Sequence, residues 1–97
     1  SMWDRVLLLP STFDVSQKDR IDLSISTMEE GTSLSQEVYQ FCESHGCDKR
    51  RAYHMSLAVE EMAGNIIQHG FPHDNKKHSV EVRVLKKGEE YVLRIRD

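Results

Sequence analysis

The chain has 97 residues, which is long enough for one small domain with a hydrophobic core and too short for two. Hydrophobic residues make up 38% of it and charged residues 30%, a balance typical of a soluble globular protein. The formal net charge is −3 and no basic stripe stands out, which argues against nucleic-acid binding as the main function. We therefore expect no nucleic-acid partner.

Cysteine use and hydropathy indicate a cytoplasmic protein. The two cysteines, Cys42 and Cys47, are too few for a disulfide framework, which indicates a reducing compartment. No apolar run approaches the roughly 20 residues that a membrane-spanning helix needs, and the run at residues 6–9 is too short for a signal peptide. We expect a cytoplasmic segment that makes no membrane contact.

Residues 1–17 differ in pattern from the rest of the chain. Residues 3–9 are mostly apolar and are stopped by Pro10, after which polar residues dominate. We expect a short strand or docking segment followed by a linker. The apolar segment either packs within its own domain or covers a sheet edge or a second copy. Residues 18–97 then form the domain proper.

A strand and a helix are predicted next along the chain. Ile21, Leu23 and Ile25 alternate with polar residues, a period typical of a strand with one buried face. Ser33 and Gln36 have the spacing of a capping box, which predicts that a helix begins there or slightly earlier. Apolar residues at helical spacing follow, at Leu34, Val38, Phe41 and Cys42. Gly46 is expected to end this helix.

A second helix is predicted from Asp48, which can cap it, to about residue 68 or 69, just before Gly70. On a helical wheel, Glu61 and Asn65 lie on one edge of a wide apolar arc. Glu60 falls on the far side of that arc, which makes it the poorer candidate for chemistry. The arc consists of Met55, Ala58, Val59, Met62, Ala63 and Ile66.

The last part of the chain reads as a β-hairpin. Val80, Val82 and Val84 alternate with polar residues, Gly88 lies in a turn, and residues 91–95 alternate again as the return strand. The element order is therefore β, α, α, β, β. This order predicts an α+β (broadly α/β) fold, a two-layer sandwich with helices on one face of a mostly antiparallel sheet.

Glu61 and Asn65 carry the chemical signal in this sequence. Residues four apart on a helix have Cβ atoms about 6 Å apart, so their head groups can converge on one small ligand. An amide oxygen suits Mg²⁺, which takes only one or two protein ligands besides phosphate oxygens and water. A nearby carboxylate can orient or deprotonate the group that attacks a phosphate. By spacing alone the signal is weak, because a Glu and an Asn four residues apart on an amphipathic helix usually mark an exposed polar edge.

Residues 61–71, EMAGNIIQHGF, resemble the N box of the GHKL ATPase superfamily, which includes gyrase and the histidine kinases. The His-Gly-aromatic ending is similar to that of the anti-sigma-factor serine kinases, and the element order over about residues 21–97 also follows the family. The resemblance implies the histidine-kinase-like ATPase fold with ATP and Mg²⁺ as cofactors. It implies that Asn65 ligates Mg²⁺ and that Glu61 is the general base.

Two further residues are assigned by the same resemblance. His69 stands where some relatives touch phosphate, although a histidine at a helix end is also stabilised by the helix dipole. Asp97 stands where the family's Asp-x-Gly-x-Gly motif begins, and in the family this Asp accepts a hydrogen bond from the adenine amino group. The chain stops there, so we expect an incomplete fold: residues 18–97 as the N-terminal part of the ATP-binding domain, weak or inactive alone.

Three hypotheses of function follow. In the first, the parent protein is an anti-sigma-factor-like serine/threonine kinase that transfers the ATP γ-phosphate to a serine of an anti-anti-sigma-type protein. A sigma factor is then a further partner, and a homodimer is the expected assembly. In the second, the fold is a non-catalytic partner-binding or dimerisation module that uses a sheet edge and residues 3–9. A phosphatase-associated or sensor-kinase ATPase domain, the third hypothesis, shares the same fold.

Overall fold

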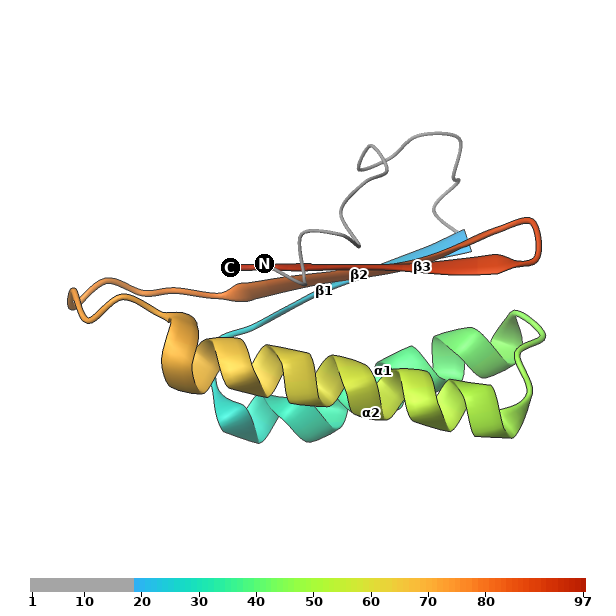
Figure 1. The fold of residues 1–97 in the computed structure, drawn as a ribbon, viewed down its shortest axis with the longest axis horizontal. Helices are drawn as coiled ribbons and strands as arrows, with labels where there is room; N and C mark the ends of the chain where they lie inside the picture. Colours follow the sequence, from blue (N-terminus) through green and yellow to red (C-terminus); the bar gives the residue numbers. More distant parts are fainter. Residues whose placement is uncertain (1–18) are drawn as a thin grey trace.

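Two helices lie side by side on one face of a three-stranded antiparallel sheet (Figure 1). The computed structural model describes residues 19–97. The expected apolar strand and linker at residues 1–17 lie outside this range. Within it, the two-layer architecture of the predicted fold class is confirmed.

The sheet is built from β1 (Arg20–Ile25), β2 (Val80–Lys87) and β3 (Glu90–Arg96), in that spatial order. Leu23 of β1 and Ile95 of β3 both lie opposite Val82 of the central strand. Because side chains alternate along a strand, this register gathers most of the apolar residues of the three strands on the helical face. Leu85 and Val92, which lie opposite each other, are on the other face. The two-residue turn between β2 and β3 contains Gly88, whose φ of 63° suits a glycine.

The first helix begins slightly before Ser33, as predicted, but its capping box is not the predicted one. A single 3₁₀ turn, η3 (Met28–Glu30), precedes α1 (Gly31–Ser44). The Glu30 carboxylate accepts hydrogen bonds from the backbone N–H groups of Ser26 at 2.8 Å and Thr27 at 3.0 Å. The capping box is therefore Thr27 with Glu30. The prediction of a box at Ser33 and Gln36 is wrong, because both residues lie inside α1.

The C-terminal end of α1 is tied to the hairpin. The carbonyl oxygen of His45 accepts hydrogen bonds from Lys86 Nζ at 2.8 Å and from the Tyr91 hydroxyl at 2.9 Å. The last carbonyls of a helix lack partners within the helix, and a lysine there also complements the helix dipole. Gly46 follows with a φ of 92°, so the chain turns where the sequence predicts that the first helix ends.

The second helix, α2 (Lys49–Asn65), begins at the predicted cap: the Asp48 carboxylate accepts a hydrogen bond from the Arg51 N–H at 2.8 Å. It continues as a π-helical turn, η4 (Ile66–Gly70), so the helical segment ends at Gly70 as predicted. No helix of residues 19–97 has the length and apolarity to cross a membrane.

The core lies between the sheet and the two helices. Its most deeply buried side chains come from every layer, so no element can shift without opening the interior. Both thiols, Cys42 and Cys47, are buried and free. The largest fully buried side chains are Leu34, Val38, Cys42, Val59, Val80, Val84 and Ile95.

Candidate functional site

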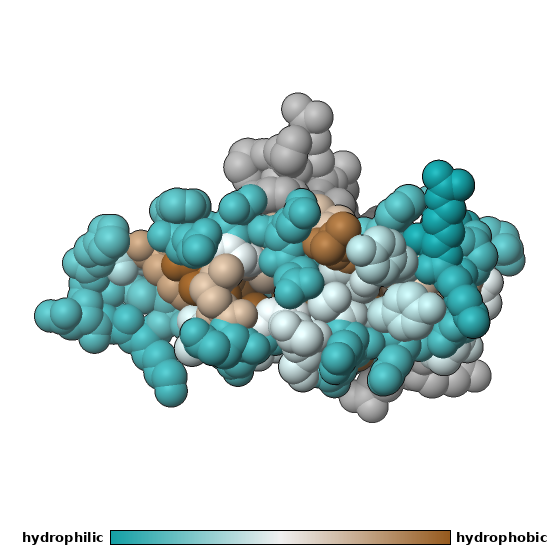
Figure 2. Space-filling model, turned by 90° about the horizontal axis from the view of Figure 1, so that it is seen from below, coloured by the Kyte–Doolittle hydropathy of each residue, from teal (hydrophilic) through white to brown (hydrophobic). Residues whose placement is uncertain are grey.

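A groove of about 370 Å³ follows one edge of α2 and is bounded on its other side by η3. We call it the α2 groove. It is lined by Met28, Leu57, Glu60, Glu61, Gly64, Asn65 and Gln68. Figure 2 shows the helical face of the molecule, where small apolar patches interrupt a mostly hydrophilic surface. The largest apolar side chains exposed among the described residues are Met28, Tyr53 and Leu57.

The groove brings together Glu61 and Asn65, the two residues that the sequence singles out. Both are exposed, one helical turn apart on α2, while Val59 and Ala63 on the opposite side of the same helix are fully buried. The buried side fixes the rotation of α2 about its axis. The polar pair therefore faces solvent from a rigid helix, in keeping with the predicted amphipathic arc.

Two glycines let η3 approach α2 closely. A Cβ atom on Gly64 would lie 3.4 Å from the Met28 Cε atom, and one on Gly31 would lie 3.5 Å from a carboxylate oxygen of Glu60. The Met28 side chain therefore rests on the α2 backbone at Gly64. This contact forms the apolar wall of the groove beside the polar pair.

Glu60 corrects one sequence interpretation. The helical wheel placed it on the far side of the apolar arc, away from Glu61, but it lines the same groove. Its side chain extends toward Gly31 at the start of α1. A wheel describes one helix in isolation and misses a groove completed by a neighbouring element. Sequence reasoning also missed Met28, because the capping box that positions η3 was placed six residues too late.

His69 and Asp97 do not line the α2 groove. His69 is an exposed residue of the π-helical turn η4, and Asp97 is exposed directly after β3. The structure leaves their assigned contacts with phosphate and adenine as predictions. The segment after η4 is ordered by its own contacts: the His78 ring nitrogen lies 2.7 Å from the Asp74 carboxylate, and this bond lowers the pKa of Asp74.

The donor set of the groove fits magnesium bound together with a nucleotide. Asn65, Glu60 and Glu61 offer an amide oxygen and carboxylate oxygens, which are the hard ligands that Mg²⁺ prefers. Within residues 19–97 no three His, Cys, Asp or Glu side chains gather into a metal-binding group. Nucleotide-bound Mg²⁺ does not need such a group, because phosphate oxygens and water fill most of its positions.

Comparison with known families supplies the deciding observation. The family model of the histidine kinase-like ATPase domain matches residues 26–97, well over half of the chain. The chain belongs to this family. The matched region of this histidine kinase-like ATPase domain begins directly after β1 and includes both helices, the α2 groove and the hairpin. Membership implies ATP binding. Neither the search of curated proteins nor that of solved structures gave a match.

Proposed function

We propose that the chain is the ATP-binding part of a serine/threonine protein kinase of the anti-sigma-factor kind, which transfers the ATP γ-phosphate to a serine of a regulatory protein. The observation that supports it is the placement of Glu61 and Asn65 one turn apart in the α2 groove. The His69-Gly70-Phe71 sequence that follows resembles the serine kinases of the family rather than its sensor histidine kinases.

In this proposal the two groove residues divide the work. Asn65 offers its amide oxygen as a ligand for Mg²⁺, which neutralises charge on the ATP phosphates when bound. Glu61 orients the substrate serine and accepts its hydroxyl proton as the oxygen attacks the γ-phosphorus. The new bond joins the serine oxygen to phosphorus, the bond to the β-phosphate oxygen breaks, and ADP leaves. Positioning and charge stabilisation supply most of the rate in such transfers.

The remaining assignments rest on the resemblance alone. Asp97 would accept a hydrogen bond from the adenine amino group, and His69 would contact phosphate. The proposed protein substrate is of the anti-anti-sigma type, with a sigma factor as a further partner and a homodimer as the assembly. The titration with MgATP depends on none of these assignments.

The first test is a thermal-shift titration of the chain with MgATP, with EDTA as a control. A ligand at about a hundred times its dissociation constant adds about 2.7 kcal/mol of stability, which raises Tm by about 10 °C or more in a domain of this size. Because this segment alone is expected to bind weakly, the titration is carried to high MgATP, and Asn65→Ala should abolish the magnesium-dependent shift that it gives. Gln68→Ala is the matched control, since it removes a second amide from the same groove. Equal shifts in the parent chain, Asn65→Ala and Gln68→Ala would contradict the assignment of Asn65.

A second candidate function, a non-catalytic dimerisation module, is favoured by one observation. Tyr53 is 56% exposed, Met28 45% and Leu57 39%, and the last two line the α2 groove. Exposed apolar residues next to one another are typical of protein interfaces. Sedimentation at rising concentration separates the candidates: a dimer that Leu57→Ser dissociates, in a chain without a nucleotide shift, would favour the module.

A further inference from the structure

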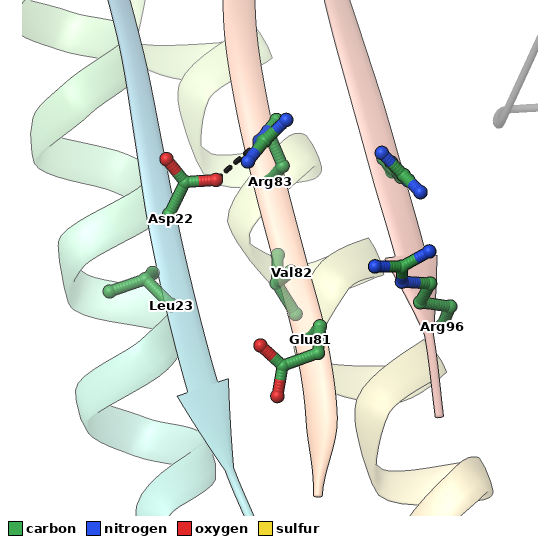
Figure 3. Close-up of a pocket in the computed structure, with 7 residues that line it drawn as sticks. Asp22, Leu23, Glu81, Val82, Arg83 and Arg96 are labelled. Carbon is green, nitrogen blue, oxygen red and sulfur yellow. Dashed lines mark hydrogen bonds and ion pairs between the residues drawn. The ribbon is translucent and has the colours of Figure 1, made fainter. Parts of the chain in front are cut away.

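The face of the sheet that points away from the helices carries a cluster of charges. On this face, side chains from β1, β2 and β3 line a small hollow of about 80 Å³. We call it the outer hollow, and Figure 3 shows its charged side chains projecting from all three strands. Its charged lining residues are Asp22, Glu81, Arg83, Arg94 and Arg96.

The first carboxylate of the outer hollow is shared by two arginines. Asp22 forms an ion pair and hydrogen bond with Arg83, across β1 and β2 (Figure 3). A second oxygen of Asp22 lies 3.2 Å from Arg20 Nε, a charge contact without hydrogen-bond geometry. One negative charge therefore serves two positive charges on this side of the hollow.

The second carboxylate is held by hydroxyl groups. Glu81 accepts hydrogen bonds from Ser24 Oγ and Ser79 Oγ, both at 2.8 Å. The bond from Ser24 is the main reason why the pKa of Glu81 is lowered, and the charge of Arg96 adds to it. Although Arg96 lies opposite Glu81 in the register, no ion pair within 4.0 Å joins Arg96 to an acid among residues 19–97.

Arg94 faces a like charge and has a buried hydrogen-bond donor. It lies directly opposite Arg83 in the β2–β3 register, so two like charges face each other. Its Nε atom is buried and has no hydrogen-bond acceptor among residues 19–97. Burial, followed by the charges of Arg96 and Arg83, lowers the pKa of Arg94. Like charges directly opposite on a sheet are destabilising, and a buried donor without an acceptor adds its own desolvation cost.

Charge complementarity indicates what binds there. Among residues 19–97, the charged lining of the hollow together with Arg20 comprises four arginines and two carboxylates, in a chain whose net charge is −3. An anion between Arg94 and Arg96 would pair with their guanidinium groups and offset the repulsion between the arginines. The hollow has room for a carboxylate, since a cavity of about 10–15 Å³ already holds one water molecule. Asp22 and Glu81 in the same lining would repel a polyanion such as nucleic acid.

We propose that the outer hollow binds an acidic segment of a protein partner, with one carboxylate seated between Arg94 and Arg96. Arginine suits this role because its planar guanidinium can pair with a carboxylate through two parallel hydrogen bonds. The site lies on the sheet face opposite the helices that carry the α2 groove. The partner therefore binds independently of the nucleotide, and the proposal does not rest on the proposed kinase function.

The test uses the full chain and a short fluorescent peptide that alternates Glu and Ser, with the matched Gln–Ser peptide as a probe control. We expect saturable binding of the Glu–Ser peptide at low salt, weaker binding at high salt, and none of the Gln–Ser peptide. Arg94→Gln/Arg96→Gln should weaken binding about tenfold or more, since each charge-assisted hydrogen bond is lost. Arg96→Gln alone, at an exposed position, covers the case in which the double variant does not fold.

The matched control is Lys49→Gln/Arg50→Gln, which removes the same charge from exposed residues at the start of α2. Its peptide affinity should stay within about twofold of the parent chain. Three results would overturn the proposal: equal losses in both double variants, no peptide binding by the parent chain, or displacement of the peptide by inorganic phosphate or a short oligonucleotide at lower concentration. Dimerisation that depends on Arg94 and Arg96 would also overturn it, because the acidic occupant would then be a second copy.

Discussion

At the scale of single residues, the α2 groove depends on the absence of a side chain at Gly64 as well as on the residues that line it. Gly64 has no side chain, and Met28 lies over it. Cys42 is instead defined by the side chains around it: it is fully buried between the layers, and this burial raises the pKa of its thiol. Both residues give predictions that need no ligand.

Gly64→Ala should leave stability unchanged or raise it by up to about 1 kcal/mol. Alanine is the better helix former by about that amount, and its new Cβ would meet only the flexible end of Met28, at 3.4 Å. Urea unfolding of the variant and the parent chain measures the difference. Gly64→Leu is the contrasting variant, because its larger side chain must displace Met28. A loss of stability in Gly64→Ala would show that η3 cannot adjust.

Cys42 should react slowly with thiol reagents in the native chain at pH 8. Burial raises the pKa of this thiol to about 11, and the thiolate is the reactive form. Alkylation rates across pH, measured in a Cys47→Ala variant so that one thiol reports, should keep rising well above pH 9. A plateau near pH 8.5, the ordinary range for a free cysteine, would contradict the burial of Cys42.

At the scale of elements, the sequence predicted the strands and helices because their periods are strong and their ends carry distinct residues. Asp48 and Gly46 were identified correctly because a cap and a left-handed turn each favour few residue types. The capping box was misplaced for a physical reason. Thr27 with Glu30 and Ser33 with Gln36 share one spacing, and a carboxylate is the stronger acceptor at a helix start.

Only part of the candidate site could be predicted from the sequence. Glu61 and Asn65 belong to one helix, so their spacing shows that they are neighbours. Met28 reaches the groove only through the docking of η3 on Gly64, and Glu60 only through the approach of α1. Contacts between elements distant in sequence depend on packing, which periodicity within one helix does not describe.

The capping box should make the stability of the fold depend on pH. Hydrogen bonds from Ser26 first and then Thr27 lower the pKa of Glu30. A group whose pKa is lower in the folded chain contributes stability above its unfolded value, near 4.3, and loses it as pH falls through the folded pKa. Glu30→Gln should therefore destabilise the chain at pH 7 and have a smaller effect at the acid end. Thermal unfolding between pH 7 and pH 3 measures the difference, with exposed Glu43→Gln as the control.

At the scale of the whole molecule, the sheet separates two surfaces of different character. One face carries the helices and the α2 groove, with its exposed carboxylates and amides. The other carries the outer hollow with its surplus of arginines. The packed core between them includes buried residues from all three strands and both helices, which makes it a rigid spacer.

This separation predicts that the two surfaces act independently. Substitutions more than about 7–10 Å apart that share no partner add in their effects. Asn65→Ala should abolish the MgATP shift and leave the affinity for the Glu–Ser peptide unchanged. Arg94→Gln/Arg96→Gln should do the reverse. Coupling between ligands is reciprocal, so titrating the peptide with and without saturating MgATP measures the same quantity from either side. A several-fold change in peptide affinity on adding MgATP would mean that the core transmits nucleotide binding to the outer face, and the independence argued from the geometry would fail.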